Sequence, residues 1–254
     1  MDNHIVIYKL ICHILKLIYI SLLFKSIQFH MVNPSTLNFL KELKQNNNKP
    51  WFDEHRKQYE NAKANYLSCA ASILAEMQKS DSSLEVLQPK DCIFRINRDI
   101  RFSTDKSPYK TNFGIVLHPH GKKFNLAAYY LHIEPGNSFV GGGLWMPEAP
   151  LLQKVRKEIA YFYKDLRQVV DTPEFSKLFG DLDVEEGQKL SRPPKGYEAD
   201  DPAIEYLKLK SFTVGVPVND DVLLSEKMTS TVTHHFNILK PFLSFINRGL
   251  MHGD

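Results

Sequence analysis

The pattern of apolar and polar positions predicts two helices early in the chain. Apolar residues recur at helical spacing over residues 37–43 and again over 59–77. A turn is expected at residues 46–50, because Asn favours turns and a proline disfavours helix in the residue before it. We expect Ser35 to cap the first helix and the second helix to begin near Phe52.

Strand-like alternation begins at residue 91 and predicts a sheet. The expected strands cover residues 92–97, 113–118, 126–134, 138–145 and 211–218. Pro135-Gly136 fits the centre of a type II turn, so strands 126–134 and 138–145 are expected to form an antiparallel hairpin. The run Gly141-Gly142-Gly143 is costly inside a strand, and close backbone packing explains it better than direct ligand contact.

Helical spacing returns after Pro147. The expected helices cover residues 151–166, 173–179 and 220–245, the last one bent at Pro241. The sequence contains no internal repeat, no low-complexity linker and no second apolar core. This order of elements predicts one α+β domain over residues 31–250, with a mainly antiparallel sheet and helices packed on it.

Composition narrows the class of protein. The chain has 254 residues, 43% hydrophobic and 24% charged, which is the profile of a globular protein rather than a disordered or disulfide-scaffold chain. Its three cysteines have no paired spacing, so we expect neither disulfides nor a cysteine-based zinc site, and a cytoplasmic location. A net charge of +3 is too balanced for an obligate nucleic-acid coat.

Residues 1–30 differ from the rest of the chain. They are almost wholly Ile, Leu, Lys, Tyr, Phe, Ser and His, and basic side chains interrupt the run of about 20 apolar residues that a transmembrane helix requires. No small-residue cleavage site follows the short apolar core Leu17–Phe24. These residue types are typical of AT-rich codons, so we expect translation to begin at Met31 and the extension to be non-native. A signal or membrane anchor is the alternative, and no membrane contact is expected for residues 31–254.

Charged and hydroxyl side chains are concentrated in residues 95–110, which contain five cations, two carboxylates and several hydroxyls. If the strand continued through residue 101, Arg98 would lie half-buried beside the core, where its charge needs a carboxylate or an anionic ligand. The sequence predicts a pocket for a phosphate- or carboxylate-bearing small molecule. The expected ligand-binding residues are Arg95, Arg98, Arg101, Ser103, Lys106 and Lys110. Asp99 and Asp105 are candidate general bases, and Tyr109 is a candidate orienting donor. In the alternative interpretation, the same charges form an internal salt-bridge network that only fixes a long connection.

Other classes of site have weaker signals. Nucleic-acid binding would use the same cations, with Tyr130 or Trp145 available for stacking, but the near-neutral domain disfavours it. His118 and His120 have a spacing compatible with a metal, and His132 lies on an expected neighbouring strand, yet the ligand set is incomplete and no metal is predicted. No nucleotide-binding glycine motif or nucleophile elbow occurs, so no cofactor is predicted. Whether the chain is an enzyme, and its oligomeric state, stay open.

A resemblance to a known family rests on the same stretch. The phrase from Ile96 to Lys110, Ile-Asn-Arg-Asp-Ile-Arg-Phe-Ser-Thr-Asp-Lys-Ser-Pro-Tyr-Lys, is similar to the signature of the microbial family called domain of unknown function twenty-four sixty-one. Further similar segments are Tyr130-Leu-His-Ile-Glu-Pro-Gly136, Arg192-Pro-Pro-Lys-Gly-Tyr197 and Leu207-Lys-Leu-Lys210. The resemblance runs from about Pro34 to Phe245 and leaves out residues 1–30. It implies a single intracellular domain and marks the motif positions to test, without implying an activity.

Overall fold

The computed structural model describes residues 31–121, 125–184 and 187–252. Residues from Met31 onward form one compact unit, which contains the whole described part of the chain. The expectation that residues 1–30 are a non-native extension lies outside the described residues.

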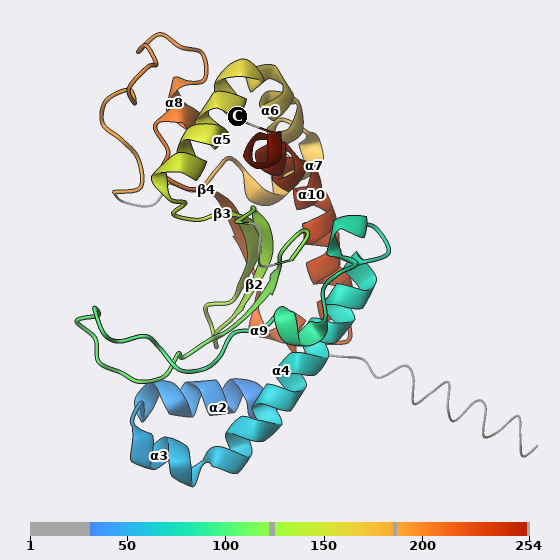
Figure 1. Cartoon of the computed structure of the whole chain (residues 1–254). Coiled ribbons are helices and arrows are strands. Elements are labelled where there is room, and N and C mark those ends of the chain that lie inside the picture. The colour runs from blue at the N-terminus through green and yellow to red at the C-terminus, as the bar shows by residue number, and fades with distance from the viewer. Residues whose placement is uncertain (1–30, 122–124, 185–186, 253–254) are drawn as a thin grey trace, which may run out of the picture. The chain divides into compact units, whose positions relative to one another are not determined.

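A four-stranded antiparallel sheet forms the centre of this unit (Figure 1). Its strands, in the order β1-β2-β3-β4, are β1 (Phe113–Leu117), β2 (Ala128–Ile133), β3 (Phe139–Leu144) and β4 (Phe212–Pro217). Gly136 has φ +73°, and the Asn137 N–H donates to the Glu134 carbonyl over 2.9 Å, so the predicted turn between β2 and β3 is confirmed. The predicted α+β class with a mainly antiparallel sheet is also confirmed.

Helices precede and follow the sheet, as the sequence predicts. The helices before it are α2 (Pro34–Gln45), α3 (Lys49–Glu54) and α4 (Arg56–Met77), with short 3-10 turns η1 (Ser82–Leu84) and η2 (Pro89–Asp91). Those after β3 are α5 (Ala149–Tyr161), α6 (Tyr163–Val170), α7 (Pro173–Phe179), α8 (Ile204–Leu207), α9 (Asp220–Leu223) and α10 (Met228–His252). Within the described residues, no helix combines the length and the apolarity that crossing a membrane requires.

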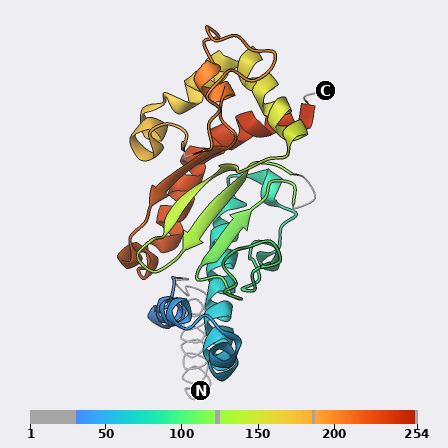
Figure 2. The ribbon, with the colours of Figure 1, turned by 90° about the vertical axis from the view of Figure 1, so that its left-hand side faces the viewer.

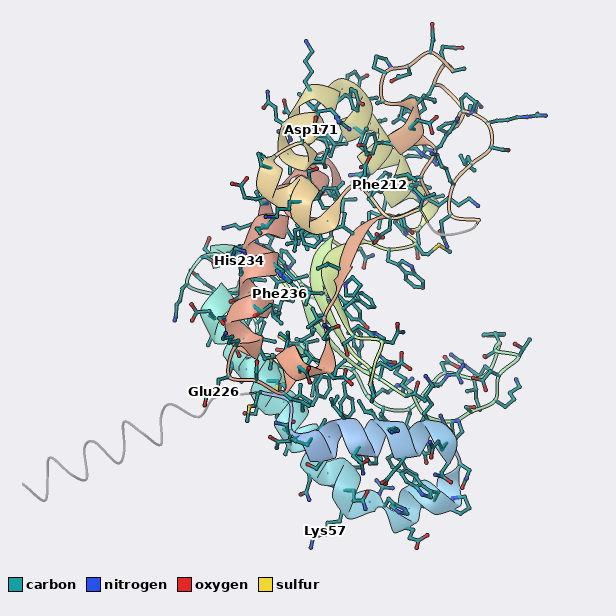
Figure 3. The ribbon with its side chains drawn as sticks, turned by 180° about the vertical axis from the view of Figure 1, so that it is seen from behind. Lys57, Asp171, Phe212, Glu226, His234 and Phe236 are labelled. Carbon is teal, nitrogen blue, oxygen red and sulfur yellow. The ribbon has the colours of Figure 1, made fainter. Side chains whose placement is uncertain are left out.

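One face of the sheet carries the core. Helices α4 and α10 pack against this face and lie behind the strands in Figure 2. The Tyr66 ring of α4 stacks on Phe113 with ring centres 4.4 Å apart, and Phe236 of α10 lies 5.1 Å from Tyr129. Phe236 is buried whereas His234 is exposed, so α10 presents different faces to the sheet and to solvent (Figure 3). Among the described residues, no helix crosses the opposite face of the sheet, which is turned toward the viewer in Figure 2.

Several helix boundaries differ from the predictions. The helix expected over residues 151–166 is divided into α5 and α6, and the one expected over 220–245 is divided into α9 and α10. The expected N-cap at Ser35 is wrong, because Pro34 is already the first helical residue and Asn33 precedes it. Proline fits that position, since its ring presets φ and its missing N–H needs no partner. In the same way Pro50 lies in the first turn of α3 rather than before a helix at Phe52, and the Asn48 side chain accepts the Trp51 N–H at 3.0 Å.

The largest difference is the expected strand at residues 92–97. The structure has only isolated bridges there, Ile93 to Ile115 and Asn97 to Tyr109. Residues 97–108, called the arm below, fold back on themselves, and the Arg98 N–H donates to the Pro108 carbonyl at 2.9 Å. Charged neighbours and Pro108 disrupt a regular ladder, so the face that an extended strand would give to Arg95, Asp99 and Arg101 does not form.

Candidate functional site

A cleft of about 1000 Å³ lies on the open face of the sheet. Side chains alternate along a strand, and the register groups Gly114 with His132, Val116 with Tyr130, and Ala128 with Gly143 on this face. Four of these side chains are small, whereas Tyr130 and His132 place a phenol and an imidazole in the cleft. Residues at the base of the arm form one wall, and the segment after β3, from Trp145 to Glu148, forms the other.

Aromatic and cationic side chains meet in the first wall. The Lys110 ammonium lies over the Phe94 ring, 4.9 Å from its centre, and both residues line the cleft. Burial, with a smaller contribution from Arg95, lowers the pKa of Lys110. Among the described residues, no carboxylate pairs with this ammonium. The opposite wall presents Trp145, which is 69% exposed.

Arg98 lines the cleft but also holds the arm together. Its guanidinium donates to the Asp105 carboxylate, to the Ser107 carbonyl at 3.1 Å and to Ser103 Oγ at 3.4 Å. The Ser107 N–H, the Ser107 hydroxyl and Arg98 together lower the pKa of Asp105 to about 2. These contacts match the internal network that the sequence analysis left open, while the position of Arg98 in the cleft wall matches the anion pocket.

Only some of the other predicted site residues line the cleft. Besides Arg98 and Lys110, Asp99 lines the cleft, and its carboxylate pairs with Arg101, with Nη2 and Oδ2 2.7 Å apart. The hydrogen bond from Arg101 lowers the pKa of Asp99. The structure leaves the remaining predicted residues outside the cleft lining, namely Arg95, Arg101, Ser103, Asp105, Lys106 and Tyr109.

Two of these outer residues have contacts that explain their positions. The Lys106 ammonium donates to the Ile100 carbonyl at 3.0 Å and is exposed on the arm. The Tyr109 ring is only 6% exposed and stacks on Phe52 with ring centres 4.0 Å apart. Tyr109 therefore anchors the base of the arm to α3.

A second polar group, which the sequence analysis did not assemble, lies along β2. Tyr130 and His132 line the cleft, and Glu134 directly follows the strand. The Tyr130 hydroxyl is 3.1 Å from His132 Nδ1, and His132 Nε2 is 3.4 Å from Glu134 Oε2. Because Glu134 accepts at Nε2, the imidazole carries its proton there, and Nδ1 accepts from the phenol. The Asn112 side-chain amide also approaches Nδ1, at 3.4 Å.

The surroundings set the charge state of this group. Burial lowers the pKa of His132 even though its contact with Glu134 opposes the shift, so the imidazole is neutral at pH 7. Burial alone would raise the pKa of Glu134, but hydrogen bonds from Lys44, Asn137 and His132 outweigh it and keep that carboxyl ionised. Burial raises the pKa of Tyr130, which therefore keeps its proton. The Tyr130 phenol, the neutral His132 imidazole and the ionised Glu134 carboxylate are thus joined by consecutive contacts.

The sequence carries a signal for this group. Positions 130, 132 and 134 alternate along an expected strand, so their side chains share one face. Period-2 spacing does not tell which face is buried, and that face is decided by α10 on the other side of the sheet.

His118, His120 and His132 have the spacing that comes nearest to a metal-binding pattern, and no metal is predicted from them. In the described segments of the chain, no three His, Cys, Asp or Glu side chains gather closely enough to hold a metal ion. His132 uses both of its ring nitrogens for the contacts with Tyr130 and Glu134.

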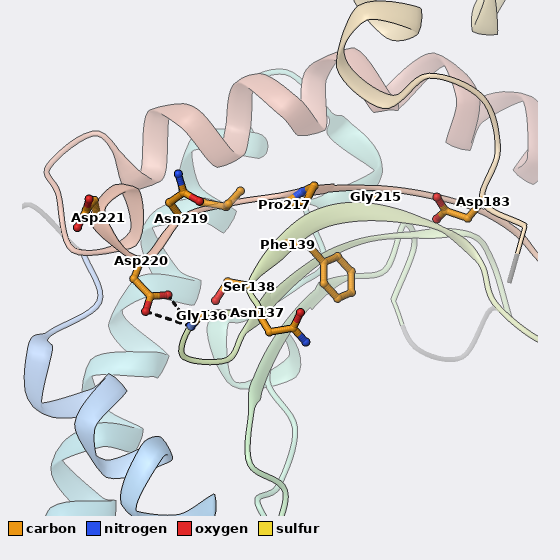
Figure 4. A pocket seen from close by; sticks show the side chains of 11 residues that line it. Gly136, Asn137, Ser138, Phe139, Asp183, Gly215, Pro217, Asn219, Asp220 and Asp221 are labelled. Carbon is orange, nitrogen blue, oxygen red and sulfur yellow. Dashed lines mark hydrogen bonds between the residues drawn. The ribbon is translucent and has the colours of Figure 1, made fainter.

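A smaller depression of about 560 Å³ lies beside the turn between β2 and β3 (Figure 4). Its lining includes Asp183, Asp220 and Asp221, and the Gly136 N–H lies 3.1 Å from each carboxylate oxygen of Asp220. Carboxylates dominate its charged groups, so it does not suit an anionic ligand.

Comparison with models of protein families shows which family the chain belongs to. A family model described as Conserved hypothetical protein (DUF2461) matches residues 35–245, which contain the sheet, the arm and the cleft. The chain belongs to this family. The family resemblance drawn from the sequence is thereby confirmed, and both the arm and the Tyr130 to Glu134 segment lie in the matched region. No curated protein and no solved structure matches the chain.

Proposed function

We propose that the cleft binds a small organic anion that carries a phosphate or carboxylate group, in the cytoplasm. The observation that carries this proposal is Lys110, a half-buried cation in the cleft wall with no carboxylate partner among the described residues. A desolvated ammonium interacts more strongly with an anion than an exposed one, because less solvent screens the pair. An incoming phosphate or carboxylate would supply the missing counter-charge.

The rest of the cleft suggests what the anion is attached to. Phe94 and Trp145 stand in opposite walls, and Ala128 and Gly143 line the floor of the cleft. A flat or apolar group can lie against such a floor and contact the aromatic walls, and mixed apolar and polar linings are typical of small-molecule sites. Arg98 is the second cation in this wall, and its planar guanidinium suits two-point contact with phosphate or carboxylate.

A thermal-shift screen tests the proposal. The full chain is heated with nucleotides, sugar phosphates, polyphosphates, carboxylates and short single-stranded DNA. A true ligand at 100 times its Kd stabilises by about 2.7 kcal/mol, which raises Tm by about 5–10 °C for a chain of this size. Lys110→Met should weaken binding about 10- to 100-fold, because it removes one charge-assisted contact.

Two further lysine variants test whether the effect on binding is specific to Lys110. Lys57→Met makes the same change on the exposed surface of α4 and should leave the shift intact (Figure 3). Lys106→Met tests whether the part of the arm outside the cleft contributes to binding. Equal shifts in wild type and Lys110→Met, or no shift with any anion, would contradict the proposal.

Nucleic-acid binding is the second candidate. It is favoured by Phe102, which is 95% exposed on the arm, and by the Arg101 guanidinium 5.8 Å from the centre of its ring. An exposed aromatic ring beside a cation suits a stacked base and its phosphate. A shift with DNA alone that fades as salt is added, and that is lost in Phe102→Ala, would select this candidate.

A further inference from the structure

We propose that the cleft catalyses hydrolysis of a phosphate ester, with Tyr130 as nucleophile, His132 as general base and Glu134 as the positioning residue. This inference rests on the proposed function, since the substrate's phosphoryl group must enter the same cleft. Tyr130 and His132 both line the cleft, and they belong to one strand, so their spacing is held by the sheet.

The contacts match the requirements of an activated nucleophile. Such a site needs a hydroxyl within hydrogen-bond reach of a base, and a third group that orients the base. The Tyr130 hydroxyl is 3.1 Å from His132 Nδ1, and His132 Nε2 is 3.4 Å from Glu134 Oε2. Phe139 stacks on the imidazole with ring centres 4.9 Å apart, and Asn112 approaches it from the segment before β1, so the ring is held from several sides.

The charges around the group suit this order of proton transfers. Glu134 is itself fixed by the Lys44 ammonium at 2.9 Å and by the Asn137 amide at 3.2 Å. An ionised Glu134 beside Nε2–H stabilises the imidazolium that forms when Nδ1 takes a proton. Lys110 and Arg98 in the cleft wall supply positive charge for the phosphoryl oxygens.

The reaction runs in two balanced steps. In the first, Tyr130 Oη attacks phosphorus in line with the bond to the leaving alcohol, and the phenolic proton passes to His132 Nδ1. That bond breaks as the alcohol oxygen takes a proton from a water molecule, which becomes hydroxide. In the second, this hydroxide attacks the phosphotyrosine from the leaving-group side, the bond between Oη and phosphorus breaks, and Nδ1 returns its proton to Oη. The products are the alcohol and inorganic phosphate, and Tyr130, His132 and Glu134 return to their starting states.

Benzenesulfonyl fluoride tests the nucleophile without knowledge of the substrate. Its tetrahedral sulfonyl group resembles a phosphoryl group, and an activated tyrosine forms an O–S bond as fluoride leaves and the base takes the proton. The full chain is incubated with the reagent at pH 7.5, and peptide mass spectrometry follows each tyrosine. Tyr161 is the internal reference, because it is 81% exposed. We expect Tyr130 to react at least ten times faster than Tyr161, even though Tyr161 is the more accessible of the two.

Variants separate catalysis from packing. His132→Gln should slow labelling of Tyr130 by about 100-fold, the usual contribution of a general base, while Tyr161 is unchanged. His234→Gln is the matched control, since it removes an exposed histidine on α10, the helix that packs on the other face of the sheet. Circular dichroism and Tm of each variant verify folding, and an unfolded variant would label Tyr130 and Tyr161 alike.

Glu134→Gln tests the positioning residue. It keeps an oxygen near Nε2 but removes the negative charge, so the imidazolium is less stable. Labelling of Tyr130 rises with pH as His132 loses its proton, and the midpoint of that rise should move to lower pH in this variant. A residue with only a structural role would not move the midpoint.

The outcomes distinguish this inference from the proposed function. Protection of Tyr130 by orthovanadate, lost in Lys110→Met, would support both. If Tyr130 reacts no faster than Tyr161, or if His132→Gln has no effect, the catalytic inference is wrong, and the anion screen still stands by itself. If Tyr130 labels selectively but orthovanadate does not protect it, phosphate esters are excluded as the substrate class.

Discussion

At the scale of single residues, the cleft depends on a position where a side chain is missing. A Cβ at Gly114 would lie 2.7 Å from the Tyr130 hydroxyl oxygen and 2.9 Å from Cε2 of the same ring. The absence of a side chain on β1 therefore leaves the space in which the phenol meets His132. The backbone of Gly114 is also used, because its carbonyl accepts the Tyr66 hydroxyl of α4.

Gly114→Ala should displace the Tyr130 hydroxyl from His132. The phenol is the flexible end of a side chain and can move aside, so we expect an overpacking cost of only about 1 kcal/mol in unfolding free energy. Labelling of Tyr130 by benzenesulfonyl fluoride should fall to the rate of Tyr161. Gly215→Ala is the control, since a Cβ there first meets an atom at 3.5 Å. Unchanged labelling in Gly114→Ala would contradict this account of the glycine.

At the scale of elements, the arm and β3 each depend on local geometry. The arm is held by the contacts of Arg98 with Asp105, Ser103 and Ser107 rather than by a ladder of strand hydrogen bonds. In β3, a Cβ at Gly141 or at Gly143 would lie 2.0 Å from a carbonyl oxygen of β4. Close backbone approach, the favoured sequence-based explanation of the three glycines, is what the structure contains.

Arg98→Ala should loosen the arm without unfolding the domain. Asp105 is 60% exposed, so water solvates its carboxylate after the guanidinium is removed, and we expect a cost below about 1 kcal/mol. Amide hydrogen exchange should become faster within residues 98–108 and stay unchanged in β2. A loss of several kcal/mol in urea unfolding would instead indicate a stranded buried charge.

Gly143→Ala should be far more costly than a glycine substitution in a turn. Its φ is +133°, and the atom in the way is the backbone carbonyl of Phe212, which cannot move without breaking the pairing of β3 with β4. We expect a loss above about 3 kcal/mol, measured by urea denaturation. Gly136→Ala, at φ +73° with no atom within 4 Å, should cost only about 1 kcal/mol.

At the scale of the whole molecule, a buried carboxylate joins the end of α4 to the sheet. Asp81 is 7% exposed and accepts hydrogen bonds from the Tyr129 hydroxyl at 2.6 Å and from Ser83 Oγ at 2.6 Å. Burial alone would raise the pKa of Asp81, but the hydrogen bonds from Ser83 and Tyr129 outweigh it and lower that pKa. The neighbouring Ser80 contacts Asn237 of α10 at 2.8 Å, so α4, β2 and α10 meet here.

Stability should therefore fall in acid as Asp81 takes up a proton. A carboxyl with a lowered folded pKa contributes stability that is present above its unfolded pKa, near 3.8, and lost as pH falls through the folded value. Asp81→Asn should flatten this acid limb when urea unfolding is compared between pH 7 and pH 3. Asp200→Asn, in an exposed loop, should keep the steep limb of the wild type. Equal acid sensitivity in wild type and Asp81→Asn would contradict the assignment.

The sequence by itself determined the local structure of this protein. Helical and strand periodicity and the turn at Gly136 are set by neighbouring residues, and the pattern predicted them, as it predicted the α+β class. The composition of residues 95–110 identified a charged cluster for the same reason. The strand expected at residues 92–97 was wrong, because its alternation is local while its ladder needs a partner along its whole length.

Tertiary structure decided which of these residues share a site. Lys110 and Lys106 look equivalent in the sequence, yet only Lys110 lies in the cleft wall, because the arm folds back and Tyr109 anchors its base on Phe52. The Tyr130 and His132 side chains face the cleft because α10 buries the other side of β2. Which face of a strand is buried depends on contacts between residues far apart in the chain, and the periodicity within one strand does not predict those contacts.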